Sequence, residues 1–378
     1  MTSTSAYATY FTIKLKSIFI SILFFAGNQM NAAQRFPFKS ELEALMREKK
    51  VPGLSLVIIE NAEIAVHMEL GLKNSQKKDL IDENTIFEAA SLSKPVFTYG
   101  ILKLVENGTL DLDKPLAEYM CYSDVTNNKL INSITARMVL THTSGFPNWR
   151  PKNESLKIHF QPGERFSYSG EGFLYLQKVV EHISGLSLEE YMQKNVFIPL
   201  GMTHSSFIWT HDSKKATGHS FDGNPIENRT EPQNAAFTMH TNSLDYAKFI
   251  IAILKGIGLN AKAINEMLQP QIRVQEGSTN SIENYTGQLS NSVSWSLGWG
   301  IQCTEMEDSF WHWGDNQGFK SFILGSKNRN NAIIIFTNSS NGLILISEVI
   351  KNYMGIPQPA LDWLEKVYST KNHKKSNA

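Results

Sequence analysis

A serine and a lysine three residues apart are the first pair in the chain whose types and spacing could do chemistry. Ser91 and Lys94 stand at the start of a segment whose apolar part covers residues 95–105. If this segment is a helix, the two side chains share one face, about 5–6 Å apart between Cβ atoms. A serine hydroxyl is a weak nucleophile until a base accepts its proton. A lysine can be that base when burial lowers its pKa enough to keep the amine neutral.

The beginning of a helix would also help the reaction electrostatically. Free N–H groups and the positive end of the helix dipole would face the carbonyl oxygen on which negative charge develops. The same spacing recurs at Ser75 and Lys78, within a polar stretch that no apolar helix follows. Because so short a pattern arises by chance, a helix cap with a solvent-facing lysine remains the alternative for Ser91.

Composition limits the classes of partner. The chain has 378 residues, with 36 basic and 36 acidic side chains, and is long enough for one large domain or two interleaved subdomains. The lack of a basic stripe argues against nucleic acid and against an electrostatic membrane partner. His204, His211 and His219 lack the spacing of metal ligands, so we expect neither a metal nor a cofactor. His142, within a Thr-His-Thr-Ser-Gly segment, is expected to fix a turn by hydrogen bonding.

The N-terminal residues have the features of an export signal. Lysines precede the apolar run 17–26, and small residues follow at Ala32 and Ala33. About ten apolar residues are too few to span a bilayer. We therefore expect residues 1–33 to be a signal peptide, 34–378 to be one domain without a membrane span, and the protein to be exported to the periplasm or secreted by a bacterium. An uncleaved anchor is the alternative, because the residue two before Ala33 is not small.

Alternating apolar residues predict strands near both ends of the chain, and helical spacing predominates between them. The strands should form one antiparallel sheet, giving an α+β fold with flanking helices and an inserted, mainly helical lobe at about 107–240. The polar stretch 271–291 is expected to be a surface excursion. The only cysteines, Cys121 and Cys303, are too few for a disulfide framework and are expected to be small buried side chains. The predicted strands cover residues 53–59, 63–70, 297–302, 309–313, 319–324 and 332–337.

Two further motifs follow the Ser91 segment. Tyr168 and Gly170 lie in Phe-Ser-Tyr-Ser-Gly, and a late strand ends in His312-Trp-Gly. With these motifs in this order, the sequence resembles the serine β-lactamase and penicillin-binding-protein superfamily, most closely its class C-like esterase and D-peptidase branch. The resemblance extends from about residue 40 to residue 353 and implies the β-lactamase/transpeptidase-like α/β sandwich. The sequence also resembles recurring segments of that family at residues 140–145, 161–170, 199–202 and 297–301.

The resemblance implies a role for each matching residue. Ser91 would be the acylated nucleophile and Lys94 its base. Tyr168 would relay protons to the leaving group, with Lys94 lowering the pKa of the phenol. His312 stands where the penicillin-binding relatives usually carry lysine, and it would donate a hydrogen bond to Tyr168 or to substrate. The backbone N–H groups of Ser91 and Asp315 would form the oxyanion hole.

The chain departs from the family pattern at the positions that would bind substrate. Gly170 replaces the asparagine of the β-lactamases, and Trp313, before Gly314, replaces a small hydroxyl residue. Asp315 adds a potential anion, and His312 is a weaker anchor for a carboxylate than lysine is. These changes indicate ester or amide substrates without a carboxylate beside the scissile bond.

The sequence therefore predicts an exported serine hydrolase that works through an acyl-enzyme on Ser91. A carboxylesterase acting on small ester or amide substrates is the first interpretation. A D-Ala-type peptidase or esterase acting on cell-wall material and a weak β-lactamase are the alternatives within the family. A catalytically silent protein that binds a peptidoglycan-like or acyl ligand is the alternative from another class.

Overall fold

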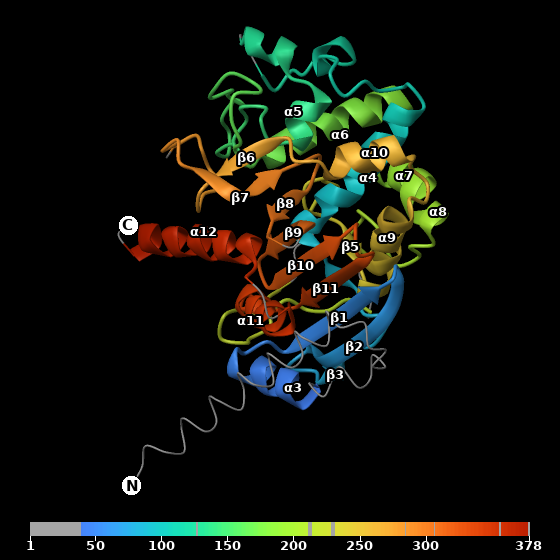
Figure 1. Cartoon of the computed structure of the whole chain (residues 1–378), viewed down its shortest axis with the longest axis vertical. Coiled ribbons are helices and arrows are strands. Elements are labelled where there is room, and N and C mark those ends of the chain that lie inside the picture. The colour runs from blue at the N-terminus through green and yellow to red at the C-terminus, as the bar shows by residue number, and fades with distance from the viewer. Residues whose placement is uncertain are drawn as a thin grey trace.

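The computed structural model describes residues 39–125, 128–210, 214–227, 231–283, 285–305, 307–354 and 357–376, so the predicted signal peptide lies outside the described residues. Within them, nine strands form one antiparallel sheet in the order β3-β2-β1-β11-β10-β9-β8-β7-β6 (Figure 1). This arrangement and the helices on both faces confirm the predicted α+β fold. The strands are β1 (Gly53–Glu60), β2 (Glu63–Asn74), β3 (Asp79–Leu80), β6 (Ile272–Gln275), β7 (Leu289–Trp295), β8 (Gly300–Cys303), β9 (Asp308–Asn316), β10 (Phe319–Ser326) and β11 (Asn331–Thr337).

The two ends of the chain meet in the centre of the sheet. Strand β1 pairs with β11, so that Leu54 lies opposite Thr337. Its side chains alternate between two apolar clusters: Val57 and Ile59 join the cluster on one face, and Leu54, Leu56 and Ile58 join the other. A strand buried on both faces needs a nearly continuous apolar run, which β1 has. Burial of each such side chain contributes about 1.5–3 kcal/mol.

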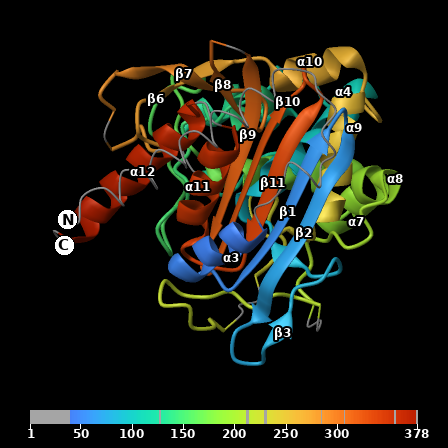
Figure 2. The ribbon, with the colours of Figure 1, turned by 60° about the horizontal axis from the view of Figure 1, so that its bottom comes forward.

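Helices cover both faces of the sheet. One face packs against α3 (Lys39–Glu48), α11 (Gly342–Met354) and α12 (Pro359–Ser376), which lie in front of the strands in Figure 2. Elements on the other face include α4 (Ser93–Glu106) and α9 (Ser243–Lys255). Helices from the middle of the chain lie at the end of the molecule opposite β3 (Figure 1). The remaining helices are α5 (Ala136–Leu140), α6 (Gly170–Ser184), α7 (Leu188–Met192), α8 (Ile198–Leu200) and α10 (Ala261–Leu268).

Two predictions, about the stretch 271–291 and about the cysteines, are wrong. The stretch 271–291 is not simply a surface excursion, because it contains β6 and the start of β7, which form one edge of the sheet. These strands are rich in Ser, Asn and Gln, and this composition hides the apolar alternation. Cys121 and Cys303 are exposed and unpaired rather than buried.

No helix in the described ranges combines the length and apolar character needed to cross a membrane.

Candidate active site

The turn that carries Ser91 is held by contacts on both sides. Ala90–Leu92 forms a 3₁₀ turn, and the α-helix begins two residues after the serine rather than at it. Ala90 has a φ of 50°, a left-handed conformation that is unusual for a residue with a Cβ. The Ser93 hydroxyl donates to the Ala90 carbonyl at 2.6 Å, and the Ser321 hydroxyl donates to the Ala89 carbonyl at 3.0 Å. These bonds fix the turn before substrate arrives.

Strand β9 runs beside this turn because Gly314 has no side chain. A Cβ at Gly314 would lie 2.4 Å from the Ala89 carbonyl oxygen and 3.1 Å from the Ala90 Cβ. Strand β8 pairs with β9 only as far as Trp311, so residues 312–316 of β9 extend beyond the end of β8. Such close approach is what the predicted oxyanion hole requires, and that pair of N–H groups stays a prediction. A substrate-binding role for Gly314 also stays a prediction, beside its clear role in packing.

Lys94 has the environment of a neutral amine. Its side chain is 1% exposed, and its Nζ donates to the Ser91 hydroxyl oxygen at 3.1 Å and to the Ala236 carbonyl at 2.8 Å. Burial lowers the pKa of Lys94 well below its usual value, because an ammonium ion loses its hydration there. A neutral amine at this distance can accept the Ser91 proton, as predicted for the base.

Tyr168 lies two residues before the start of α6, with the centre of its ring 4.6 Å from Lys94 Nζ. Burial raises the pKa of Tyr168, and the Asp315 charge raises it further, while the nearby Ser91 hydroxyl lowers it. The prediction that Lys94 lowers the pKa of Tyr168 is wrong, because a neutral amine supplies no charge to offset burial. Among the described residues the phenol oxygen has no hydrogen bond of ordinary geometry. Tyr168 therefore enters the reaction protonated and able to donate.

His312 is also neutral, and the site fixes its tautomer. Burial lowers the pKa of His312 well below its usual value, and a charge on Lys94 would lower it further. Because a carbonyl can only accept, Nδ1–H donates to the Trp313 carbonyl at 2.7 Å, which leaves Nε2 as an acceptor. Nε2 has no partner among the described residues. In this tautomer neither ring nitrogen has a proton to donate to Tyr168 or to substrate, so the predicted hydrogen bond from His312 is wrong for the neutral imidazole.

His142 positions Tyr168, a role that the sequence indicated only as a turn-fixing hydrogen bond. Its Nδ1 accepts the backbone N–H of Ser169 at 3.0 Å, and its ring centre lies 4.2 Å from that of Tyr168. The residue has a φ of 56° and is fully buried. Burial lowers the pKa of His142 well below its usual value, and a charge on Lys94 would lower it further. The imidazole thus acts as a neutral support for the motif tyrosine.

Hydrogen bonds with Tyr368 on helix α12 hold Trp313 and Asp315, two of the predicted site residues on β9. Trp313 is buried, and its Nε1–H donates to the Tyr368 hydroxyl at 3.2 Å. Tyr368 donates in turn to Asp315 Oδ2 at 2.5 Å, and Lys320 Nζ lies 2.8 Å from Asp315 Oδ1. The Asp315 carboxylate is therefore engaged rather than free. Tyr368, on α12, was missed because it lies 53 residues away in sequence.

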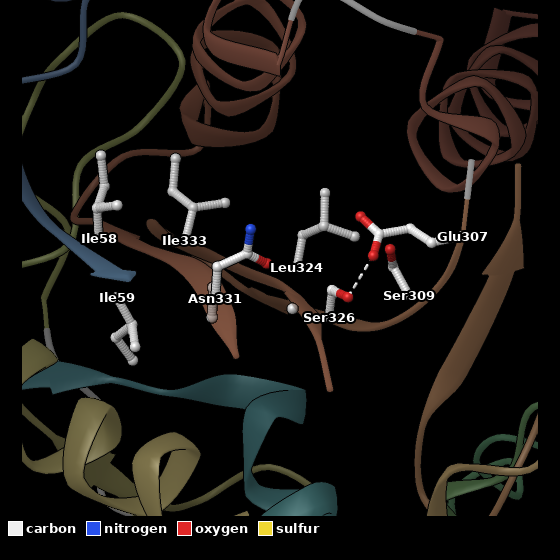
Figure 3. A pocket seen from close by; sticks show the side chains of 10 residues that line it. Ile58, Ile59, Glu307, Ser309, Leu324, Ser326, Asn331 and Ile333 are labelled. Atoms are coloured by element: carbon white, nitrogen blue, oxygen red, sulfur yellow. Dashed lines mark hydrogen bonds between the residues drawn. The ribbon is translucent and has the colours of Figure 1, made fainter. Parts of the chain in front are cut away.

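Two hollows in the described part of the structure are not lined by the nucleophile or its base. Figure 3 shows one of about 20 Å³ at the ends of β1, β9, β10 and β11, where Ser326 donates a hydrogen bond to Glu307. That volume suits a water molecule. A larger one, of about 440 Å³, lies beside α3. Neither hollow is lined by Ser91 or Lys94, so it is the chemistry around Ser91 that identifies the site. No His, Cys, Asp or Glu cluster suited to a metal occurs in the described ranges.

Comparisons with known proteins agree with this geometry. The family model described as Beta-lactamase matches residues 38–343. Protein flp of Staphylococcus aureus strain N315 is 24% identical over 324 residues, which cover 79% of this chain and 61% of that protein. The chain thus spans less than two thirds of the length of such relatives.

Solved structures share the fold. The penicillin binding protein from Bacillus halodurans has a TM-score of 0.69 and 22% identity, covering 83% of this chain and 99% of that one. The D-alanine carboxypeptidase AmpC from Burkholderia cenocepacia has a TM-score of 0.69 and 16% identity, covering 84% and 97%. Since the family model matches most of the chain, and a buried amine faces a serine at the expected place, the protein belongs to the Beta-lactamase family of serine hydrolases.

Proposed function

We propose that the protein is an exported carboxylesterase that acts on small ester or amide substrates through an acyl-enzyme on Ser91. The observation that carries the proposal is the buried Lys94 amine, 3.1 Å from the Ser91 hydroxyl. Ser91 Oγ attacks the substrate carbonyl carbon as its proton passes to Lys94 Nζ. Tyr168 donates a proton to the leaving oxygen or nitrogen and regains one from the Lys94 ammonium. Water then cleaves the acyl-enzyme by the reverse sequence of proton transfers.

The choice of substrate rests on the groups around the nucleophile. His312 stays neutral because burial lowers its pKa, so it offers no cation to hold a substrate carboxylate. Trp313 fills the position of a small hydroxyl residue, and Asp315 carries a carboxylate nearby. All three features favour a substrate that is uncharged beside the scissile bond. The apolar run 17–26 and its preceding lysines support export.

A D-Ala-type peptidase or esterase acting on cell-wall material is the second candidate. Two of the similar proteins are named as a penicillin binding protein and a D-alanine carboxypeptidase. This candidate requires that a C-terminal carboxylate be accepted next to a neutral His312. A weak β-lactamase requires the same, because penicillins carry a carboxylate.

Labelling and turnover by the full chain and its Ser91→Ala variant separate these candidates. We expect a fluorophosphonate to label the wild type alone, and the wild type to hydrolyse ethyl acetate faster than a D-Ala-D-Ala peptide or a cephalosporin. Hydrolysis retained by Ser91→Ala would refute the acyl-enzyme. A lasting penicillin adduct together with peptide cleavage would favour the second candidate. An unlabelled wild type would favour a silent binding protein. For export, we expect the mature chain to begin near residue 34.

A further inference from the structure

An exposed tryptophan packs over the beginning of α6, two residues after the motif tyrosine. Trp149 is 43% exposed, although large apolar side chains usually avoid solvent. Its ring lies against Gly170, where a Cβ would come within 2.4 Å of the indole. The Trp149 ring also contacts Phe237, at 5.4 Å between ring centres and 77° between planes. Gly170 is therefore glycine because Trp149 occupies the space of a side chain there.

The residues on either side of Trp149 are anchored to α6. The Asn148 carbonyl accepts the backbone N–H groups of Gly170 at 3.0 Å and Glu171 at 3.1 Å. The backbone N–H and Nε of Arg150 donate to Glu171 Oε1, and Arg150 Nη2 donates to Oε2 at 2.8 Å. The Glu171 side chain is only 5% exposed, so this two-pronged ion pair is shielded from water. The indole is thus held in place while part of it remains open.

Both segments that Trp149 touches adjoin the reacting groups. Gly170 follows Tyr168 by two residues, and the Tyr168 ring lies beside Lys94. Phe237 follows Ala236, whose carbonyl accepts the Lys94 amine. The tryptophan therefore contacts residues that lie two positions from Tyr168 and one position from Ala236 in the chain. An aromatic surface that is already ordered binds a ligand without a further loss of conformational entropy.

We propose that Trp149 determines specificity by stacking on an aromatic or similarly planar apolar group of the substrate. The inference rests on the proposed function and narrows its substrate class to aryl-bearing esters. An offset or edge-to-face contact with an aromatic group, added to the apolar area that it buries, is worth roughly a tenfold preference. Smaller alkyl esters would leave the exposed part of the indole in water and gain nothing from it.

Three esters with simple groups on both sides of the bond test this. The full chain and its Trp149→Ala and Trp149→Phe variants are each incubated with ethyl phenylacetate, phenyl acetate or ethyl acetate. Titration of the released acid measures the rate of hydrolysis. We expect Trp149→Ala to lower kcat/KM about tenfold for at least one aryl ester relative to ethyl acetate. The ester affected shows whether the acyl or the leaving group stacks. Trp149→Phe should keep most of the preference, because a benzene ring still stacks.

A matched control removes another exposed aromatic ring. Phe221 is 67% exposed, and its carbonyl accepts a hydrogen bond from Asn341 near the start of α11, so Phe221→Ala should leave all three rates unchanged. Wild-type preference for aryl esters retained by Trp149→Ala would overturn the inference and leave the proposed function intact. A wild type that neither hydrolyses any ester nor reacts with a fluorophosphonate would overturn both. Thermal melting would show that each variant is folded before its rates are compared.

Discussion

Replacing Gly314 with alanine would show whether the packing of β9 against the nucleophile turn fixes Ser91. The added Cβ would lie 2.1 Å from Ser321 Oγ and 2.4 Å from the Ala89 carbonyl oxygen, whereas ordinary contacts begin at 3.4 Å. The serine side chain can rotate away, but the carbonyl belongs to the backbone of the turn. The strand and the turn must therefore separate by about 1 Å.

A shift of that size has two expected effects. Misplacement by about 1 Å lowers a catalysed rate on the order of 100-fold, and overpacking costs about 1–3 kcal/mol of unfolding free energy. The assay is kcat/KM for an ester substrate together with denaturant unfolding. Adding Ser321→Ala removes the first overlap but leaves the carbonyl, so it should recover part of the stability and little of the activity. It also removes the bond from Ser321 to the Ala89 carbonyl.

Gly325→Ala is the matched control for Gly314→Ala. A Cβ at Gly325 would lie 2.5 Å from the Phe310 ring, a similar overlap on the neighbouring strand β10. The register places Gly325 four residues from Ser321, about 13 Å further along the sheet. We expect a comparable loss of stability with kcat/KM within about twofold of wild type. Unchanged kcat/KM in Gly314→Ala, or an equal loss in the control, would refute the reasoning.

Four further predictions concern single groups. Because Lys94 must be neutral and burial lowers its pKa, the rate of fluorophosphonate labelling should fall as the pH drops through that pKa and stay high above it; faster labelling in acid would contradict this. Tyr168→Phe should lower ester turnover about 100-fold or more in steady-state assays. Tyr368→Phe should lower kcat more than it raises KM, because it releases one oxygen of the carboxylate on β9. Cys121 and Cys303 should both react with maleimide without denaturant, with Cys303 slower because burial raises its pKa to about 11; mass spectrometry would count the adducts.

The parts of the fold and site that the sequence predicts well depend on short-range patterns. Ser91 and Lys94 meet because three residues make one turn, whether that turn is α or 3₁₀. Strand β1 was evident because its burial on both faces demands a nearly continuous apolar run. The edge strand β6 was hidden because only two of its own residues, Val274 and Gln275, are buried. The alternation of apolar and polar residues is weakest in a strand that buries few of its side chains.

The parts that the sequence could not predict depend on contacts between distant segments. Trp149 becomes a fixed surface only when its neighbour Arg150 meets a buried glutamate 21 residues later. Tyr368 reaches β9 only because α12 packs across that face of the sheet. The raised pKa of Tyr168 follows from burial that no local pattern reports. These side chains acquire their roles from tertiary packing, so their spacing in the sequence carries no signal.

The neutrality of three basic groups explains how one proton can be directed through this site. Burial keeps Lys94, His142 and His312 uncharged, since each has a pKa well below its usual value. When Lys94 takes the Ser91 proton, its new charge lowers the pKa of both histidines further, so neither competes for that proton. Tyr168, still protonated and beside the ammonium, can then donate to the leaving group. A charged lysine in place of His312 would oppose protonation of Lys94, so His312→Lys should slow acylation of an uncharged ester while improving binding of one that carries a carboxylate.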